Sequence, residues 1–141
     1  MVRTWPTAVV IVTLAGLCAS CSNDNAAVTD ARAACGIANP VLPGQASAQT
    51  AGQNLSGYRV AQTYSARATA ADPRWGKLND AIGTLITAWA TIVDAAGPDY
   101  VNSGGVTATS RLGVAIEQYG SSAAAAERTV RSECAVAQTG S

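Results

Sequence analysis

Apolar residues recur at every third or fourth position along most of this chain, which is the spacing of one face of an α-helix. The clearest case lies between Asp72 and Gly97. Its apolar positions alternate in steps of three and four residues: Trp75, Leu78, Ile82, Leu85, Trp89, Ile92 and Ala96. Asp72 is a suitable N-cap, Pro73 fits the first helical position, and Gly97-Pro98 ends the pattern. A helix with one buried face is therefore predicted. Its solvent face comprises Lys77, Asp80, Thr84, Thr87, Thr91 and Asp94.

Two further helices are predicted before this one. A short helix begins at Thr29 or Asp30 and runs through Cys35, because Asn39-Pro40 and Pro43-Gly44 stop it. A longer helix covers about residues 45–71. Its apolar stripe comprises Leu55, Tyr58, Ala61 or Gln62, and Ser65.

The last predicted helix begins near Thr109 or Ser110 and reaches about Ala137, after a loop over residues 99–109. Its core face comprises Leu112, Ile116, Tyr119, Ala123, Ala126, Val130 and Cys134. Glu127 and Arg131, four residues apart on its outer side, predict an ion pair. One short helix and three longer ones, joined by short loops, predict an all-α, up-and-down helical bundle.

The N-terminal segment has the pattern of a bacterial export signal. A basic start precedes an apolar run over residues 8–17, which is shorter than the roughly 20 residues needed to cross a bilayer. Small residues and a cysteine follow, and this ending resembles a bacterial lipobox, in which the cysteine receives a diacylglyceryl group and becomes the new N-terminus. Ala19-Ser20 supplies the small pair before Cys21, so we predict lipidation at Cys21. Modification of Cys18 is the alternative.

Processing at Cys21 divides the chain into three parts: a signal peptide over 1–20, a lipidated polar tether over 21–28 and a helical bundle domain over 29–141. Cys18 leaves with the signal peptide, so Cys35 and Cys134 remain as an even pair in an oxidising compartment. Because Cys134 lies on the predicted core face, we predict a Cys35–Cys134 disulfide. Two buried free thiols are the alternative.

Charge and composition narrow the range of functions. Nine basic and nine acidic residues give a net charge of zero, so the chain lacks the positive field that binds nucleic acid. It has no histidine, which removes Ser-His-Asp and Cys-His nucleophiles and most zinc and haem sites. We therefore predict a protein that is not an enzyme and has no metal or other cofactor.

Three aromatic residues are the candidate ligand-binding positions. Tyr58, Trp75 and Trp89 combine apolar rings with polar tips, which suits a pocket for a small apolar ligand between helices. The alternative is that they fill the core. Alanine-rich neighbouring helices favour space beside them, and we predict that a ligand would lie between Trp75 and Trp89.

The helix start Asp72-Pro73-Arg74-Trp75, the lipobox-like ending and the two cysteines of the body together resemble the small Ala-rich lipoproteins of actinobacteria. The resemblance implies a helical fold and a cell-envelope location, and it brings no catalytic residues. The body is also similar to small secreted mycobacterial haem carriers, although only tyrosine is available here as a haem ligand.

These observations predict a non-enzymatic lipoprotein on the outer face of the cell membrane. Its lipid would be the membrane attachment, and its bundle would bind an envelope partner protein or a small apolar ligand. Two alternatives stay open: a structural or accessory envelope subunit with no ligand, and a haem or lipid carrier.

Overall fold

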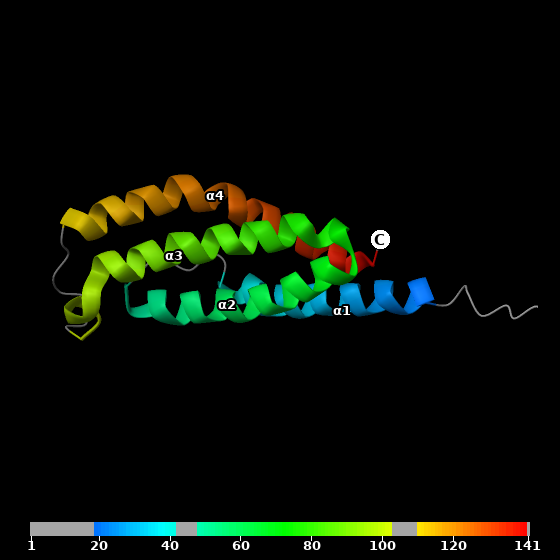
Figure 1. Ribbon diagram of the computed structural model, residues 1–141. Coiled ribbons are helices and arrows are strands. Elements are labelled where there is room, and N and C mark those ends of the chain that lie inside the picture. Colours follow the sequence, from blue (N-terminus) through cyan, green and yellow to red (C-terminus); the bar gives the residue numbers. More distant parts are fainter. Residues whose placement is uncertain (1–18, 42–47, 103–109, 141) are drawn as a thin grey trace, which may run out of the picture.

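The chain folds into a bundle of antiparallel helices. The computed structural model describes residues 19–41, 48–102 and 110–140. These residues form α1 (Ala19–Ala38), η1 (Asn39–Val41), α2 (Ala48–Ala71), η2 (Pro73–Trp75), α3 (Gly76–Asn102) and α4 (Ser110–Thr139). Consecutive α-helices run in opposite directions, and α1 begins at the same end of the bundle at which α4 finishes (Figure 1). The predicted all-α, up-and-down bundle is confirmed.

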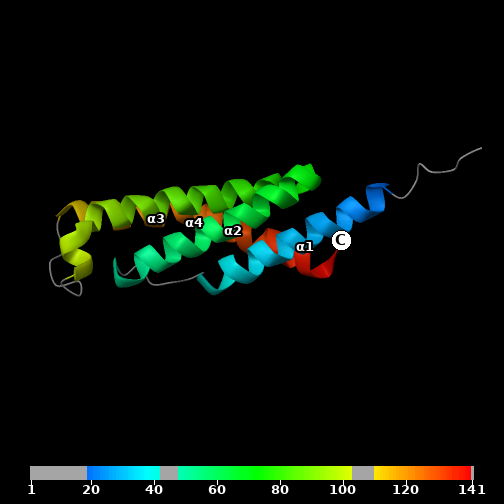
Figure 2. The same ribbon diagram turned by 60° about the horizontal axis from the view of Figure 1, so that its bottom comes forward.

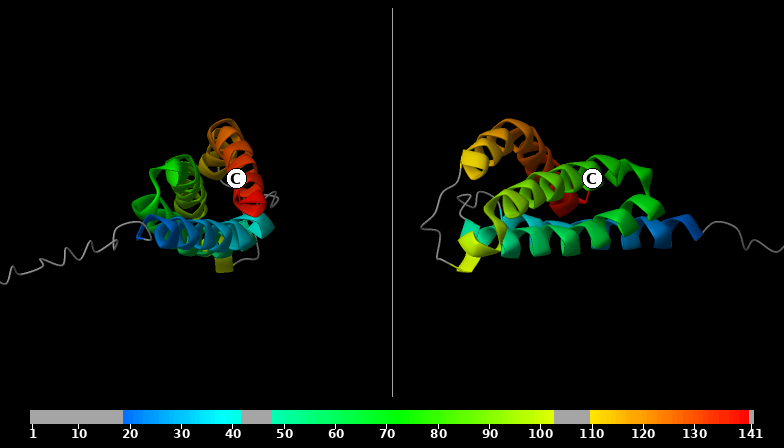
Figure 3. Two further views of the ribbon diagram at one scale, coloured as in Figure 1. Left: turned by 90° about the vertical axis from the view of Figure 1, so that its right-hand side faces the viewer. Right: turned by 60° about the vertical axis from the view of Figure 1, so that its left-hand side comes forward.

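Neighbouring helices in the sequence are also the main packing partners. α2 packs against both α1 and α3, and α3 packs along α4. α1 meets α4 over a shorter stretch, where the C-terminal end of α4 approaches it (Figure 3). α1 is also displaced along the bundle axis, so its first turns extend past one end and it finishes well before the other end (Figure 2). The other end of the bundle is therefore built from α2, α3 and α4.

The core combines a few large side chains with many alanines. η2 and α3 together contribute the largest share, because the entire predicted stripe is buried: Trp75, Leu78, Ile82, Leu85, Trp89, Ile92 and Ala96. The fully buried side chains of α1 are all small, namely Ala27, Ala31, Ala34, Cys35 and Ala38, while its larger Val28 and Ile37 pack against the core only partly buried. Alanine allows close approach of two helices but removes little apolar area from water. The buried face of α1 therefore contributes little apolar area per residue.

The predicted signals at both ends of α3 are confirmed, with two refinements. The Asp72 side chain accepts a hydrogen bond from the backbone N–H of Arg74 at 3.0 Å, and Pro73 follows at the first position. The first turn is a 3₁₀ turn, and the α-helix begins at Gly76. Gly97 breaks the helix with φ 67°, a left-handed conformation that glycine adopts without strain. Helical backbone resumes up to Asn102, so the predicted loop over 99–109 is wrong for residues 99–102, and its remainder lies outside the described residues.

The first helix is longer than predicted. It begins at Ala19 instead of Thr29 or Asp30, and residues 22–28 are helical rather than an extended tether. Thr29 does not cap a helix start, because its hydroxyl donates to the carbonyl of Asn25 within the helix at 2.8 Å. Ala27 and Ala31, four residues apart, are both fully buried. Their contact with the bundle extends the helix backward through the segment that was predicted to be a tether.

One predicted core position in α4 is wrong. Ile116 is 39% exposed, whereas the neighbouring Ala115 is only 4% exposed and takes the buried position. Ile116 lies on the same face as Cys134, about five turns earlier in the helix. Cys134 is covered because Cys35 of α1 lies against it. α1 finishes at Ala38, so no part of α1 reaches the level of Ile116.

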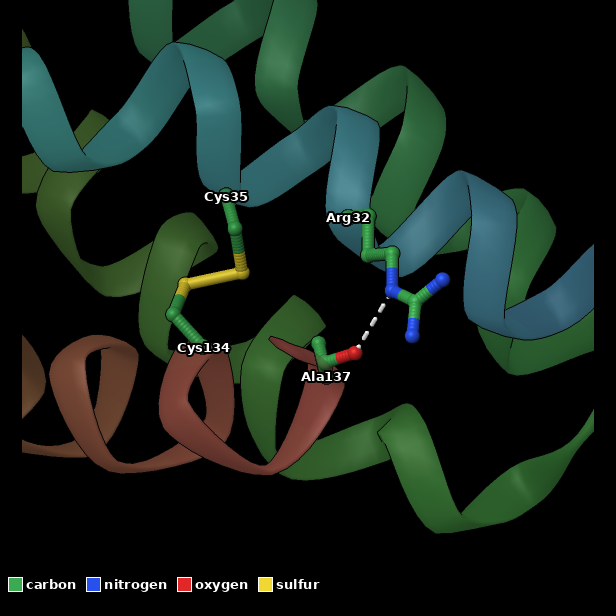
Figure 4. Close-up of a disulfide and its surroundings, with 4 residues drawn as sticks. All are labelled: Arg32, Cys35, Cys134 and Ala137. Carbon is green, nitrogen blue, oxygen red and sulfur yellow. Dashed lines mark hydrogen bonds between the residues drawn. A yellow bond between two sulfur atoms is a disulfide. The ribbon is translucent and has the colours of Figure 1, made fainter. Parts of the chain in front are cut away.

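The Cys35–Cys134 disulfide is present and joins α1 to α4 across a sequence separation of 99 residues (Figure 4). Beside it, the Arg32 guanidinium donates from Nε to the Ala137 carbonyl at 2.8 Å (Figure 4). Its Nη2 lies 3.5 Å from the carbonyl of Gln138. The last carbonyls of a helix have no partners within the helix, so Arg32 caps α4 from a neighbouring element. A covalent bond and a cationic cap therefore hold the same two helix ends together.

Candidate functional site

The structure separates the three predicted ligand-binding residues. Tyr58, Trp75 and Trp89 have relative exposures of 0%, 1% and 0%. Trp75 and Trp89 lie about 21 Å apart along α3 at about 1.5 Å per residue, so one small ligand cannot span both. Trp75 lies under the guanidinium of Arg74, whose carbon is 4.9 Å from the ring centroid. A ligand between Trp75 and Trp89, as predicted, would therefore require these packed side chains to move.

Two of the three residues instead belong to a polar cluster in the centre of the bundle. This Tyr–Trp–Glu cluster comprises Tyr58 of α2, Trp89 of α3, and Tyr119 and Glu127 of α4. The rings of Trp89 and Tyr119 have their centroids 4.9 Å apart at an interplanar angle of 59°. The Tyr119 hydroxyl donates to Glu127 Oε1 at 2.9 Å. Three helices therefore contribute polar atoms to one cluster, which is buried at Tyr58 and Trp89 and partly exposed at Tyr119 and Glu127.

Glu127 is the residue that sequence reasoning misplaced. The predicted ion pair with Arg131 is absent from the ion pairs of the described residues, and Glu127 is half-buried with Tyr119 as its hydrogen-bond donor. Tyr119 and Glu127 are eight positions apart, which is not a spacing of adjacent side chains on a helix. No local pattern in the sequence could therefore have indicated this bond.

Electrostatics in the cluster favour neutral tyrosines. Burial raises the pKa of Tyr58 well above its ordinary value of 10.0, and the negative charge of Glu127 raises it further. Burial likewise raises the pKa of Tyr119, and its hydrogen bond to Glu127 adds to this effect. The indole N–H of Trp89 is close enough to lower both values slightly, but it makes no well-formed hydrogen bond. Both hydroxyls thus keep their protons at neutral pH.

These pKa shifts predict loss of stability in alkali. Each folded-state pKa lies above the unfolded value, so the unfolded chain releases protons first as the pH rises above about 10. The contribution of both tyrosines is fully present below about pH 10 and is lost progressively above it. Urea midpoints measured from neutral to alkaline pH, with tyrosinate absorbance recorded in parallel, should fall above pH 10. The fall should be shallower in Tyr119→Phe, and an equal fall in that variant would contradict the assignment.

The two tyrosine hydroxyls should differ in their effect on stability. The Tyr58 hydroxyl is buried and has no hydrogen-bond partner among the described residues. Tyr58→Phe should therefore leave the free energy of unfolding unchanged or raise it by up to about 1 kcal/mol, whereas Tyr119→Phe should lower it by about 1.5–3 kcal/mol. Urea denaturation of both variants checks the order. A larger loss in Tyr58→Phe would show that its hydroxyl has a partner.

The surface opening nearest to this cluster lies between α3 and α4. We call it the α3–α4 groove: one wall carries Thr84, Thr87 and Thr91, the other carries Gln118, Ser121 and Ser122, and the floor comprises Ala88, Ala115 and Tyr119. Its volume is about 480 Å³. A second hollow of about 350 Å³ shares Thr91, Ala115 and Gln118 with it and continues toward Asp94 and Arg111. Tyr58, Trp75 and Trp89 line neither hollow.

Sequence reasoning described one wall of this groove only as a solvent face. The threonines of α3 are exposed, as predicted, but they lie beside α4 rather than alone on an outer surface. Within the described ranges, no group of three or more cysteine, aspartate or glutamate residues is arranged to hold a metal ion. None of the helices in these ranges combines the length and hydropathy needed to cross a bilayer.

The fold and its covalent link define a disulfide-tied, all-α, antiparallel four-helix bundle within the described residues. No family model, curated protein or solved structure matches this chain.

Proposed function

We propose that the chain is an exported, lipid-anchored, non-enzymatic binding protein of the cell envelope, and that the α3–α4 groove is its binding surface. This choice of surface rests on the difference in exposure between the predicted aromatic residues and the groove. The predicted aromatic residues are fully buried, whereas the groove is open and lined by uncharged polar side chains. A ligand can enter the groove without displacing packed core residues.

The burial of the three aromatic residues disfavours an apolar ligand bound among them. Tyr58, Trp75 and Trp89 would all have to move before a lipid tail or haem could contact them, because each is at most 1% exposed. Removing large side chains from a close-packed core costs several kcal/mol. A structural or accessory subunit without a ligand is the competing function, and it predicts that changes in the groove have no effect on any binding.

Lipidation at Cys21 would place the bundle close to the membrane and leave the groove accessible. Cys21 lies in the first turn of α1, six residues before the buried Ala27, which is about 9 Å along a helix. The η2 turn and the C-terminal end of α4 lie toward the same end of the bundle (Figure 1). The groove lies further along α3 and N-terminal in α4, away from the anchored end.

The test of the anchor is expression of the full chain in a bacterial host that processes lipoproteins. Mass spectrometry of the membrane fraction should recover an N-terminal peptide that begins at diacylated Cys21. Cys21→Ala should abolish membrane retention, and the matched variant Cys18→Ala should retain it. A peptide that keeps Ala19 with an unmodified Cys21, or loss of retention in Cys18→Ala alone, would overturn the assignment.

A further inference from the structure

We infer that the α3–α4 groove takes an uncharged, hydroxyl-rich ligand of the oligosaccharide class. This inference rests on the proposed role of the groove as the binding surface, and it adds the chemistry of the ligand. It follows from the hydrogen bonds that the groove residues already make.

The five threonine and serine hydroxyls of the groove walls donate to carbonyls of their own helix, while the sixth hydroxyl, that of Tyr119, donates to Glu127. Thr84 donates to Asp80 at 3.0 Å, Thr87 to Gly83 at 3.1 Å and Thr91 to Thr87 at 2.9 Å. Ser121 and Ser122 on the opposite wall both donate to the Gln118 carbonyl, at 2.9 Å and 2.8 Å. A hydroxyl that donates in this way keeps its acceptor lone pairs. Both walls therefore present hydrogen-bond acceptors to whatever lies between them.

The Gln118 side chain supplies the complementary donor. It is exposed and lines both hollows, so it lies where the two hollows adjoin. An amide both donates and accepts, which suits a ligand whose own groups do the same. Sugar hydroxyls have this property, and their protons can meet the acceptors on the two walls.

The lining of the 480 Å³ part of the groove disfavours charged ligands, because the charged residues Asp94 and Arg111 line only the second hollow. No charged side chain lines the 480 Å³ part of the groove, so it offers no counter-charge to a phosphate, a carboxylate or an ammonium group. Its less exposed lining residues are Ala88, Ala115 and Tyr119. Apolar alanine side chains and a tyrosine between polar walls match a sugar ring, which has C–H groups on its faces and O–H groups around its edge. The volume lies in the range of small-molecule sites, about 300–1,000 Å³.

Binding can be measured with the purified full chain and two neutral probes, maltohexaose and an N-acetylglucosamine tetramer. Isothermal titration calorimetry should show saturable binding of at least one probe. The tryptophan emission should also change, because the Trp89 ring lies 4.9 Å from Tyr119 on the groove floor. Thr87→Val combined with Gln118→Leu should weaken binding about tenfold, since hydrogen bonds from both walls to the ligand are lost.

Thr63→Val is the matched control. Thr63 is an exposed threonine of α2 whose hydroxyl also donates to the carbonyl four residues earlier, Arg59, but it lies outside the groove. The Thr63→Val variant should bind the probes with the same affinity as the unmodified chain. Equal binding by the groove variant and the unmodified chain would overturn the inference, as would the absence of binding to both probes at millimolar concentration. Binding of a neutral peptide in place of the sugars would overturn the ligand class. Each of these results is independent of the mass-spectrometric test of lipidation, so failure of the anchor and failure of the ligand class are distinguishable.

Discussion

Loss of the Cys35–Cys134 disulfide is expected to lower the free energy of unfolding by about 4.7 kcal/mol, the chain-entropy value for closing a loop of about 100 residues. The bond is important here because the fully buried side chains of α1 are all small. The loss is comparable with the whole stability of a small domain, about 5–15 kcal/mol. α1 is expected to be the first element to separate from the bundle.

Cys35→Ala combined with Cys134→Ala is the suitable variant. Both sulfur positions are buried, so alanine avoids placing an unpartnered hydroxyl in the core. Urea denaturation of the variant should match that of the reduced unmodified chain. The hydrogen bond from Arg32 to Ala137 remains in the variant and should preserve some contact between the helix ends. A loss below about 1 kcal/mol would show that packing alone holds α1 in place.

The elements that could be predicted from sequence are those with strong contrast between their two faces. The stripe of α3 alternates large apolar residues with charged residues and threonines, and its ends carry Asp72-Pro73 and Gly97. The sequence therefore predicts which of its positions are buried and which are exposed. α1 has no such contrast, because alanine occupies both its buried and its exposed positions. Its start at Ala19 depends on contacts between α1 and the rest of the bundle, which the sequence pattern of α1 alone does not indicate.

The remaining differences depend on distances between helices. Ile116 has the right periodicity for burial, but its exposure depends on where a different helix ends. The bond between Tyr119 and Glu127 links positions too far apart for a helical neighbour rule. The α3–α4 groove needs the solvent face of one helix to lie beside the next helix at a particular angle. Periodicity within one segment carries none of this information.

Substitution of Trp89 distinguishes a role in the core from a role in a ligand pocket, because the two roles predict different losses of stability. It is completely buried and lies against Tyr119, with Tyr58 also close. Trp89→Ala should therefore lower the free energy of unfolding by about 3–5 kcal/mol, the usual cost of truncating a large core side chain and leaving a cavity. Thermal or urea unfolding measures this loss. Val60→Ala is the control, because Val60 is 48% exposed on α2 and its truncation should change stability by no more than about 0.5 kcal/mol.

The cavity left by Trp89→Ala provides a second readout. If the indole ring fills a close-packed space, added indole should bind the variant and restore part of its lost stability, as apolar cavities bind matching apolar molecules. The unmodified chain should show no such stabilisation, because its own indole occupies the space. A loss below about 1 kcal/mol without rescue would mean that Trp89 is loosely packed. It would also restore the hypothesis that an apolar ligand binds beside this residue, whereas a large loss with rescue by indole assigns Trp89 to the core and leaves the α3–α4 groove as the binding surface.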